Sequence, residues 1–274
     1  MQLAVSHIAW PKDRESEFLV RASDLGVEGL EIAPGRIWAA PEKASAQEVK
    51  AYRVFARERG LKIVSLHALL YDRPELQIFG STAEVSAVSD FLKAMCRVAA
   101  WLECPYLVLG SPKNRSRNGL RLGEAMEHAV TVFENIGREA AALGVCLLIE
   151  PLGPLETDFI VSAEQGKDLV DRVASPGFGL HLDAKALSVD SLPRALRCTA
   201  GLARHFHASE PDLACPGASG TVPHEEIGWL LEQYGYKGFV SIEMVAGSNP
   251  VRNLEDAVNV VKRCYPIRNP EAMG

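Results

Sequence analysis

Four residues that can bind a metal ion or transfer a proton each end a short apolar run in the second half of the chain. Glu150 ends LLIE, Asp183 ends GLHLD, His207 ends RHFH and Glu243 ends VSIE. Three carboxylates and one imidazole form a mixed oxygen and nitrogen set that suits an octahedral divalent ion such as Mn²⁺, Mg²⁺ or Co²⁺, with Zn²⁺ less favoured. If the four runs end on one side of the fold, the sequence predicts a metal centre there.

These runs belong to a regular alternation of strand-length apolar segments with longer segments of helical period. Glycines precede several of the apolar runs and suit the left-handed residue that follows a helix; they are Gly26, Gly60, Gly144 and Gly235. Two S-x-x-E motifs, beginning at Ser45 and Ser81, have the spacing of helix capping boxes. The pattern predicts repeated strand–helix units.

Eight strands are expected, at about 2–8, 27–32, 61–67, 105–110, 145–150, 178–183, 203–208 and 238–243. Strands that alternate with helices pair in parallel, and eight such units in one α/β domain suit a closed (β/α)8 TIM barrel. A doubly wound open sheet is the alternative, but the chain has neither G-x-G-x-x-G after its first strand nor a P-loop motif. We therefore predict one domain over 1–274, with 267–274 as a frayed tail. In such a barrel the strand ends form the site.

Composition limits the class of partner. The 35 acidic and 29 basic residues give a formal net charge of −6, which provides no electrostatic reason to bind nucleic acid or an anionic membrane. No apolar run approaches the length of about 18 residues that a spanning helix needs, and the first residues do not resemble a signal peptide. We expect a cytoplasmic protein that acts on a small molecule; whether it forms a homo-oligomer stays open.

Several stretches resemble the xylose isomerase-like TIM-barrel superfamily, the sugar phosphate isomerase/epimerase group, over most of residues 1–266. They are IEP at 149–151, HLD at 181–183, HFHASE at 205–210, PGASGTV at 216–222 and GYKGFVSIE at 235–243. The resemblance implies that Glu150, Asp183, His207 and Glu243 bind a divalent metal ion, with Mn²⁺ favoured. It also implies that Glu150 and Glu243 act as the acid/base pair.

The chemistry that this pair would perform is proton transfer next to a carbonyl group. Removal of the proton leaves an ene-diolate, which a divalent ion stabilises through two adjacent oxygens. One glutamate can abstract the proton and the other return it, giving epimerisation, or isomerisation if the proton returns to the neighbouring carbon. The expected function is a sugar, sugar phosphate or sugar acid isomerase or epimerase. A metal-dependent dehydratase is the first alternative and a non-catalytic carbohydrate-binding barrel the second.

Other polar residues at the predicted mouth are candidates for substrate binding. His67 closes the third strand, Glu31 lies at the end of the second, and Glu156 follows Glu150 by six residues. The basic residues Lys113, Arg115 and Lys185 follow the fourth and sixth strands. Because lysine and arginine pair well with carboxylates and phosphates, these residues indicate an anionic carbohydrate.

The chain also differs from the pattern of the family it resembles at two positions. Ala186 stands where several relatives have a histidine three residues after the sixth-strand aspartate, and Leu213 stands where ketose 3-epimerases have a substrate-binding arginine. His67 remains, but with Ser111 at the end of the fourth strand and Ala186 after the sixth, a trinuclear zinc site like that of endonuclease IV cannot be assembled. The sequence thus argues against a nuclease and leaves the sugar itself undefined.

Overall fold

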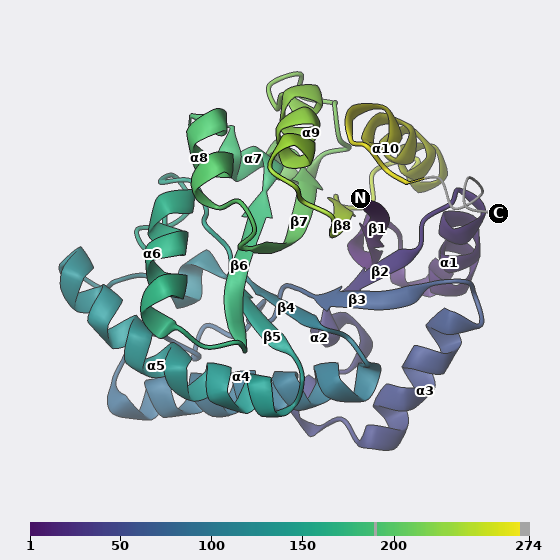
Figure 1. Cartoon of the computed structure of the whole chain (residues 1–274). Helices are drawn as coiled ribbons and strands as arrows, with labels where there is room; N and C mark the ends of the chain where they lie inside the picture. Colours follow the sequence, from purple (N-terminus) through teal and green to yellow (C-terminus); the bar gives the residue numbers. More distant parts are fainter. Residues whose placement is uncertain (189–190, 269–274) are drawn as a thin grey trace.

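The computed structural model describes residues 1–188 and 191–268. Its eight strands form a closed barrel in chain order, as Figure 1 shows. The strands are β1 (Gln2–Ser6), β2 (Gly29–Ile32), β3 (Lys62–Leu66), β4 (Tyr106–Leu109), β5 (Cys146–Ile149), β6 (Phe178–Asp183), β7 (Ala203–Ser209) and β8 (Phe239–Glu243). All eight predicted strands are present, and the TIM-barrel prediction is confirmed.

Every strand pairs in parallel with its neighbours, and β8 closes the barrel by pairing with β1 through Leu3 and Val240. Helices lie outside the strands: α1 (Glu15–Asp24), α2 (Pro34–Ile37), α3 (Ala46–Arg57), α4 (Thr82–Leu102), α5 (Leu122–Ala142), α6 (Ala163–Val173), α7 (Ala184–Leu187), α8 (Leu192–Cys198), α9 (His224–Gln233) and α10 (Pro250–Cys264). The short helices α2 and α7 follow β2 and β6 directly, so they help to build the rim at the carboxyl ends of the strands.

Local sequence signals account for many of the helix boundaries. The side chains of Ser45 and Ser81 each accept a hydrogen bond from the backbone amide of the glutamate three residues later, and that glutamate's carboxylate accepts one from the serine amide, so both predicted capping boxes are confirmed. The four glycines expected at helix ends have φ between 71° and 85°. An L-residue rarely adopts this conformation, which explains why glycine precedes the strands.

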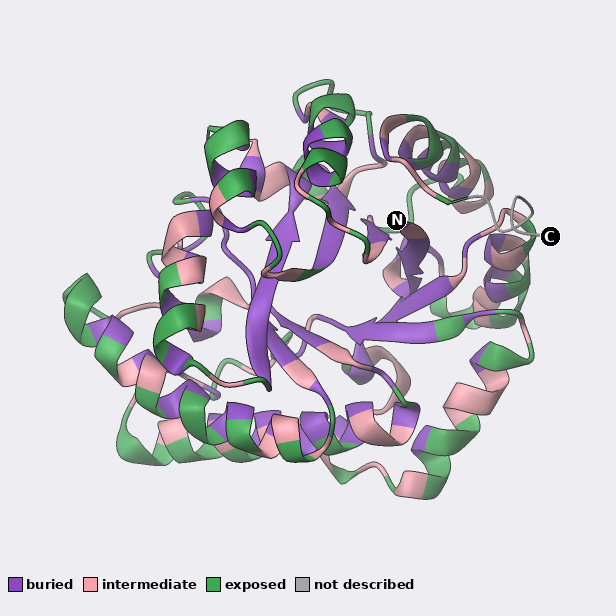
Figure 2. Cartoon of the chain, in the orientation of Figure 1, coloured by how far each residue is buried: buried purple, intermediate pink, exposed green. Residues whose placement is uncertain are grey.

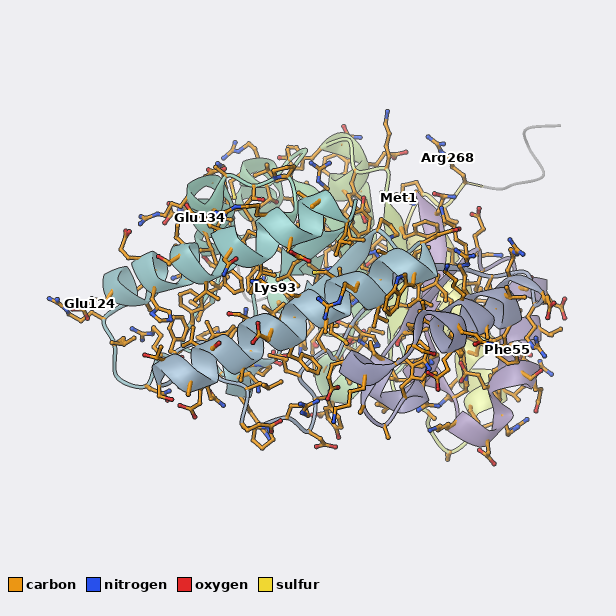
Figure 3. The ribbon with its side chains drawn as sticks, turned by 90° about the horizontal axis from the view of Figure 1, so that it is seen from below. Met1, Phe55, Lys93, Glu124, Glu134 and Arg268 are labelled. Carbon is orange, nitrogen blue, oxygen red and sulfur yellow. The ribbon has the colours of Figure 1, made fainter. Side chains whose placement is uncertain are left out.

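The outer helices bury one face each, as the banded colouring of Figure 2 shows. In α5, for example, Met126, Phe133 and Ile136 are buried while Glu124 and Glu134 are exposed. The long helices α4 and α5 lie side by side in Figure 3 and cover one flank of the barrel. Apolar packing between helices and strands therefore leaves the barrel interior free to carry polar groups.

The two ends of the described chain meet. The Met1 ammonium donates a hydrogen bond to the Pro266 carbonyl (3.0 Å), and the Arg268 amide donates one to the Met1 carbonyl (2.8 Å). Met1 and Arg268 accordingly lie close together in Figure 3. Residues 267–268 are thus tied to the barrel and not frayed as predicted, while the remainder of the expected tail, 269–274, lies outside the described residues. Within the described chain, we find no helix long and apolar enough to cross a membrane.

Candidate active site

Polar side chains fill the interior of the barrel near the carboxyl ends of its strands. Ser65, His181, His205 and Ser241 have no exposed surface, and neither has Glu31. Branched apolar side chains usually fill this space in a TIM barrel. A polar interior needs partners for every buried group, so its arrangement indicates a site.

The four predicted ligands come together at this end. Asp183 ends β6 and pairs in register with His207 of β7, Glu243 ends β8, and Glu150 directly follows β5. One atom each from Asp183, His207 and Glu243 lie within 4.8 Å of one another, and so do atoms from Glu150, His181 and His207. His207 belongs to both groups and is the centre of the cluster.

His207 uses its two ring nitrogens differently. Nε2 hydrogen-bonds to the Glu31 carboxylate at 3.0 Å. Nδ1 lies 3.3 Å from Oε2 of Glu243 and 3.9 Å from Oε1 of Glu150, and among the described residues it makes no hydrogen bond. The ring therefore turns a nitrogen that makes no hydrogen bond toward two carboxylates, an arrangement that a metal-ligating histidine also has.

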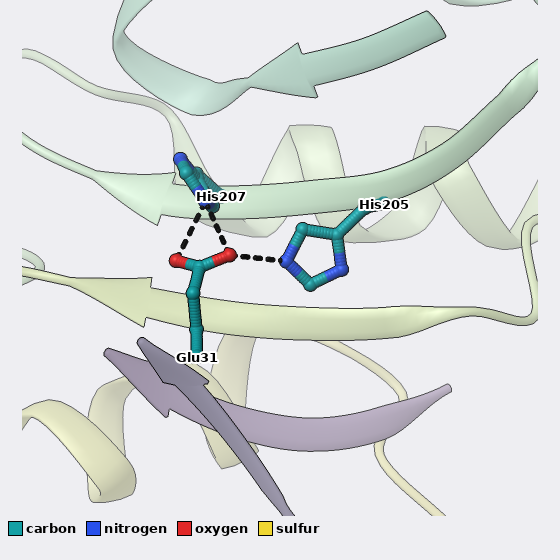
Figure 4. Close-up of side chains that lie close together, drawn as sticks. All are labelled: Glu31, His205 and His207. Atoms are coloured by element: carbon teal, nitrogen blue, oxygen red, sulfur yellow. Dashed lines mark hydrogen bonds and ion pairs between the residues drawn. The ribbon is translucent and has the colours of Figure 1, made fainter. Parts of the chain in front are cut away.

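Glu31 holds this imidazole from below. Its carboxylate contacts His207 through both oxygens and also accepts a hydrogen bond from His205 at 2.8 Å, as Figure 4 shows. The hydroxyls of Ser65 and Ser241 hydrogen-bond to the same carboxylate. The side chain is fully buried, so the structure does not place Glu31 at the mouth where the sequence suggested a substrate contact. A carboxylate behind a histidine fixes the ring orientation and its tautomer.

Burial and charge separate the two candidate acid/base residues. Burial and the carboxylates of Asp183 and Glu243 raise the pKa of Glu150 to about 8, against the opposing effect of His207. Burial would raise the pKa of Glu243 as well, but His207 and His67 hold it below its usual range. Two glutamates in one cluster thus differ in the ease with which they ionise.

The histidines of the cluster also differ from one another. Although burial lowers the pKa of His207, Glu31 and Glu243 outweigh it and hold that pKa well above its ordinary value. Burial, followed by the charge of His207, holds the pKa of His181 well below its ordinary value. His207 is therefore the charge partner of the carboxylates, whereas His181 is a neutral ring beside Glu150, with Nε2 3.7 Å from Oε1.

His67 contacts a candidate catalytic group and is 3% exposed. Its Nδ1 lies 3.1 Å from Oε1 of Glu243, and its Nε2 lies 2.7 Å from Oγ of Ser6. Both ring nitrogens are therefore engaged by the protein. Sequence reasoning predicted that His67 binds substrate; in the structure its ring contacts Glu243 and Ser6.

The residues predicted at the rim have three different environments. Lys185 pairs with Glu156 at 3.0 Å across the loops after β6 and β5. Lys113 is exposed in the turn after β4. Arg115, two residues further along, is fully buried. The cluster thus has one ion pair at its rim and one buried cation beside it.

Sequence reasoning missed Ser209, which supports a predicted ligand. Its hydroxyl donates a hydrogen bond to Oδ2 of Asp183 and accepts one from the Lys185 amide at 3.4 Å. Ser209 follows His207 by two residues on β7, so the period-two alternation of a strand would have placed it on the same face.

Cavities alone do not locate this site. A cavity of about 590 Å³ is lined by Gln2, Arg57 and Lys62, among others, and these residues lie at the opposite end of the barrel. In TIM barrels, chemistry occurs at the carboxyl ends of the strands. The candidate active site is therefore identified by the charged side chains gathered at the carboxyl ends of the strands, and not by this cavity.

The chain corresponds to a known family. Residues 19–264 match the xylose isomerase-like TIM barrel family, and the chain belongs to it. It is 24% identical over 238 residues to fructoselysine 3-epimerase of Escherichia coli O157:H7. The aligned residues cover 82% of this chain and 83% of that protein.

Further similarity is to D-psicose 3-epimerase. The Ruminiclostridium cellulolyticum enzyme is 31% identical over 119 residues, a stretch that spans 43% of this chain and only 40% of that protein. In structure, the chain is similar to D-psicose 3-epimerase with D-tagatose from Clostridium cellulolyticum H10, with a TM-score of 0.80, 19% identity, and coverage of 96% of this chain and 99% of that chain. At that identity the structural likeness establishes the fold.

Proposed function

We propose that the protein is a divalent-metal-dependent carbohydrate epimerase or isomerase that removes and returns a proton on a carbon next to a carbonyl group. The observation that carries the proposal is the gathering of Glu150, Asp183 and Glu243 around His207, whose Nδ1 makes no hydrogen bond within the described residues. The family, and relatives whose names describe sugar 3-epimerases, support a carbohydrate substrate.

The donor set fits a divalent ion. Three carboxylates within one cluster, those of Glu150 and Asp183 buried and that of Glu243 partly buried, repel one another, and no arginine or lysine pairs with Asp183 or Glu243 among the described residues. Such a set is satisfied by a hard cation with oxygen and imidazole ligands, of which Mn²⁺ is the best match. Glu150, Asp183, His207 and Glu243 would hold it. The ion would supply the positive charge that stabilises an ene-diolate.

The protein's own groups divide the remaining work. Glu243 is held by His67 at 3.1 Å and by His207 at 3.3 Å, which fixes its carboxylate for proton transfer. The Glu150 carboxylate has no hydrogen bond within the described chain and lies against Gly110 at the end of β4. We assign the two glutamates to opposite directions of proton transfer, one as base and one as acid. Glu31 and Ser209 orient His207 and Asp183.

Product analysis tests the class of reaction. Purified full-length protein with Mn²⁺ would be incubated with a panel of ketoses, sugar phosphates and sugar acids, and products identified by NMR and mass. A product of unchanged mass, formed only with the metal present, supports an epimerase or isomerase. A product lighter by one water would instead establish a dehydratase, and binding without turnover by the metal-loaded protein would favour a non-catalytic barrel.

A further inference from the structure

Arg115 is a buried arginine without a partner. Its side chain has no exposed surface, and among the described residues Nε, Nη1 and Nη2 make no hydrogen bond and no carboxylate oxygen lies within 4.0 Å. Burial of an unpaired charge costs several kcal/mol, and buried arginines therefore have anionic partners. The guanidinium offers five donors in a planar fork, all of them available here.

The chain on both sides of Arg115 is fixed. The Asn114 side chain donates hydrogen bonds to the carbonyls of Arg73 and Leu76, both at 2.8 Å, in the loop after β3. Arg117 donates from its amide to Oδ1 of Asp158 at 3.0 Å and from Nε to the Asp158 carbonyl at 2.7 Å, in the loop after β5. The segment is thus held between two loops of the catalytic end, which reduces the entropy lost on binding a ligand.

This position adjoins the candidate active site. Glu150 and Glu156 are the carboxylates that act most strongly on Arg115, and they favour its charged form although burial lowers its pKa to about 10. The guanidinium therefore stays protonated near neutral pH. Glu156 is already paired with Lys185. Within the part of the chain that the structure describes, Arg115 is thus a buried cation on the β4 and β5 side of the cluster with no carboxylate in ion-pair distance.

We propose that Arg115 binds an anionic group of the substrate, a carboxylate or phosphate, through a bidentate contact that the planar guanidinium is shaped to make. The inference rests on the proposed function, since it assigns the substrate of that site to the sugar acids or sugar phosphates.

Three ketoses that differ at one terminus test the proposal. Binding of D-fructose, D-fructuronate and D-fructose 6-phosphate to the Mn²⁺-loaded protein would be measured by calorimetry for the natural chain, for Arg115→Met and for the matched control Arg57→Met, which removes an exposed arginine at the opposite end of the barrel. We expect at least one anionic ketose to bind tenfold or more tightly than D-fructose. This preference should vanish in Arg115→Met and persist in Arg57→Met.

A second measurement does not depend on the choice of sugar. Thermal unfolding in a buffer free of oxyanions, with glycolate or inorganic phosphate then added, reports whether an oxyanion stabilises the protein through Arg115. Stabilisation that is lost in Arg115→Met supports the assignment of Arg115. This holds even if none of the sugars is turned over, because absence of turnover contradicts only the proposed function. No oxyanion effect in the natural chain, or an equal loss of turnover on neutral and anionic ketoses in Arg115→Met, would overturn it and show a structural role near Glu150.

Discussion

Replacement of Glu31 by glutamine tests how the buried network supports the metal centre. Glu31 accepts hydrogen bonds from His205 at 2.8 Å and His207 at 3.0 Å, and its charge favours the protonated Nε2 that leaves Nδ1 free to bind metal. Glutamine has nearly the same shape but no charge, and its amide group would place a donor against one of the two rings. Loss of such a partner weakens metal binding by about 10- to 100-fold, or about 1.4 to 2.7 kcal/mol.

Titration of the metal-free protein with Mn²⁺, followed by EPR of the free ion, measures this loss. The lost charge also lowers the pKa of His207, which Glu31 helps to raise, and this eases competition between the proton and the metal at low pH. The affinity loss should therefore be larger at pH 8.5 than at pH 6.5. Measuring the Mn²⁺ affinity at both pH values therefore separates the effect of Glu31 on the orientation of the His207 ring from its effect on the protonation of that ring.

Glu210→Gln is the matched control. Glu210 is also a fully buried glutamate that contacts a histidine, with Nε2 of His224 at 3.0 Å, but it holds the loop after β7 and not the cluster. The control should keep its Mn²⁺ affinity. Unchanged affinity in Glu31→Gln, with the fold intact by circular dichroism, would refute the assignment of Glu31 as a positioning residue.

Two further changes have defined outcomes. In the metal-free protein the pKa of Glu150 is raised to about 8, so ionisation of Glu150 destabilises the fold increasingly from pH 4.5 to 8. At pH 8.5, Glu150→Gln should therefore have a free energy of unfolding about a few kcal/mol larger than that of the natural chain, and a higher melting temperature. At pH 4 the two proteins should have the same melting temperature. A lower melting temperature at pH 8.5 would contradict this. In Gly110→Ala the new Cβ would overlap Oε2 of Glu150, and turnover should fall at least tenfold. The control Gly123→Ala, which has open space around the new Cβ, should retain its activity. Equal activity in the two variants would show that Glu150 moves freely.

The architecture follows from local sequence signals. Strand-length apolar runs, capping boxes and glycines at helix ends are set by residues close in the chain, and the strand bounds agree with the prediction to within two residues at either end. Parallel strands in chain order then bring their carboxyl ends together without further information. This is why Glu150, Asp183, His207 and Glu243 could be grouped before any coordinates were known.

Depth within the barrel could not be predicted in the same way. Glu31 lies where the register between β2 and β3 shifts, and its carboxylate is directed below the cluster. That placement depends on the stagger of neighbouring strands, which one strand's sequence does not specify. Arg115 has a similar explanation: a charged loop residue normally lies in solvent, and only the packing of the loops after β3 and β5 around its segment buries it.

Deuterium exchange tests the central claim most directly. The Mn²⁺-loaded protein in D₂O, with D-fructose, D-fructuronate and D-fructose 6-phosphate, should incorporate deuterium at a carbon next to the carbonyl, as read by NMR and mass. Chelation should abolish the exchange, and Glu150→Gln and Glu243→Gln should each lower it at least a hundredfold. Exchange that proceeds at the natural rate in both folded variants would contradict the two-glutamate account.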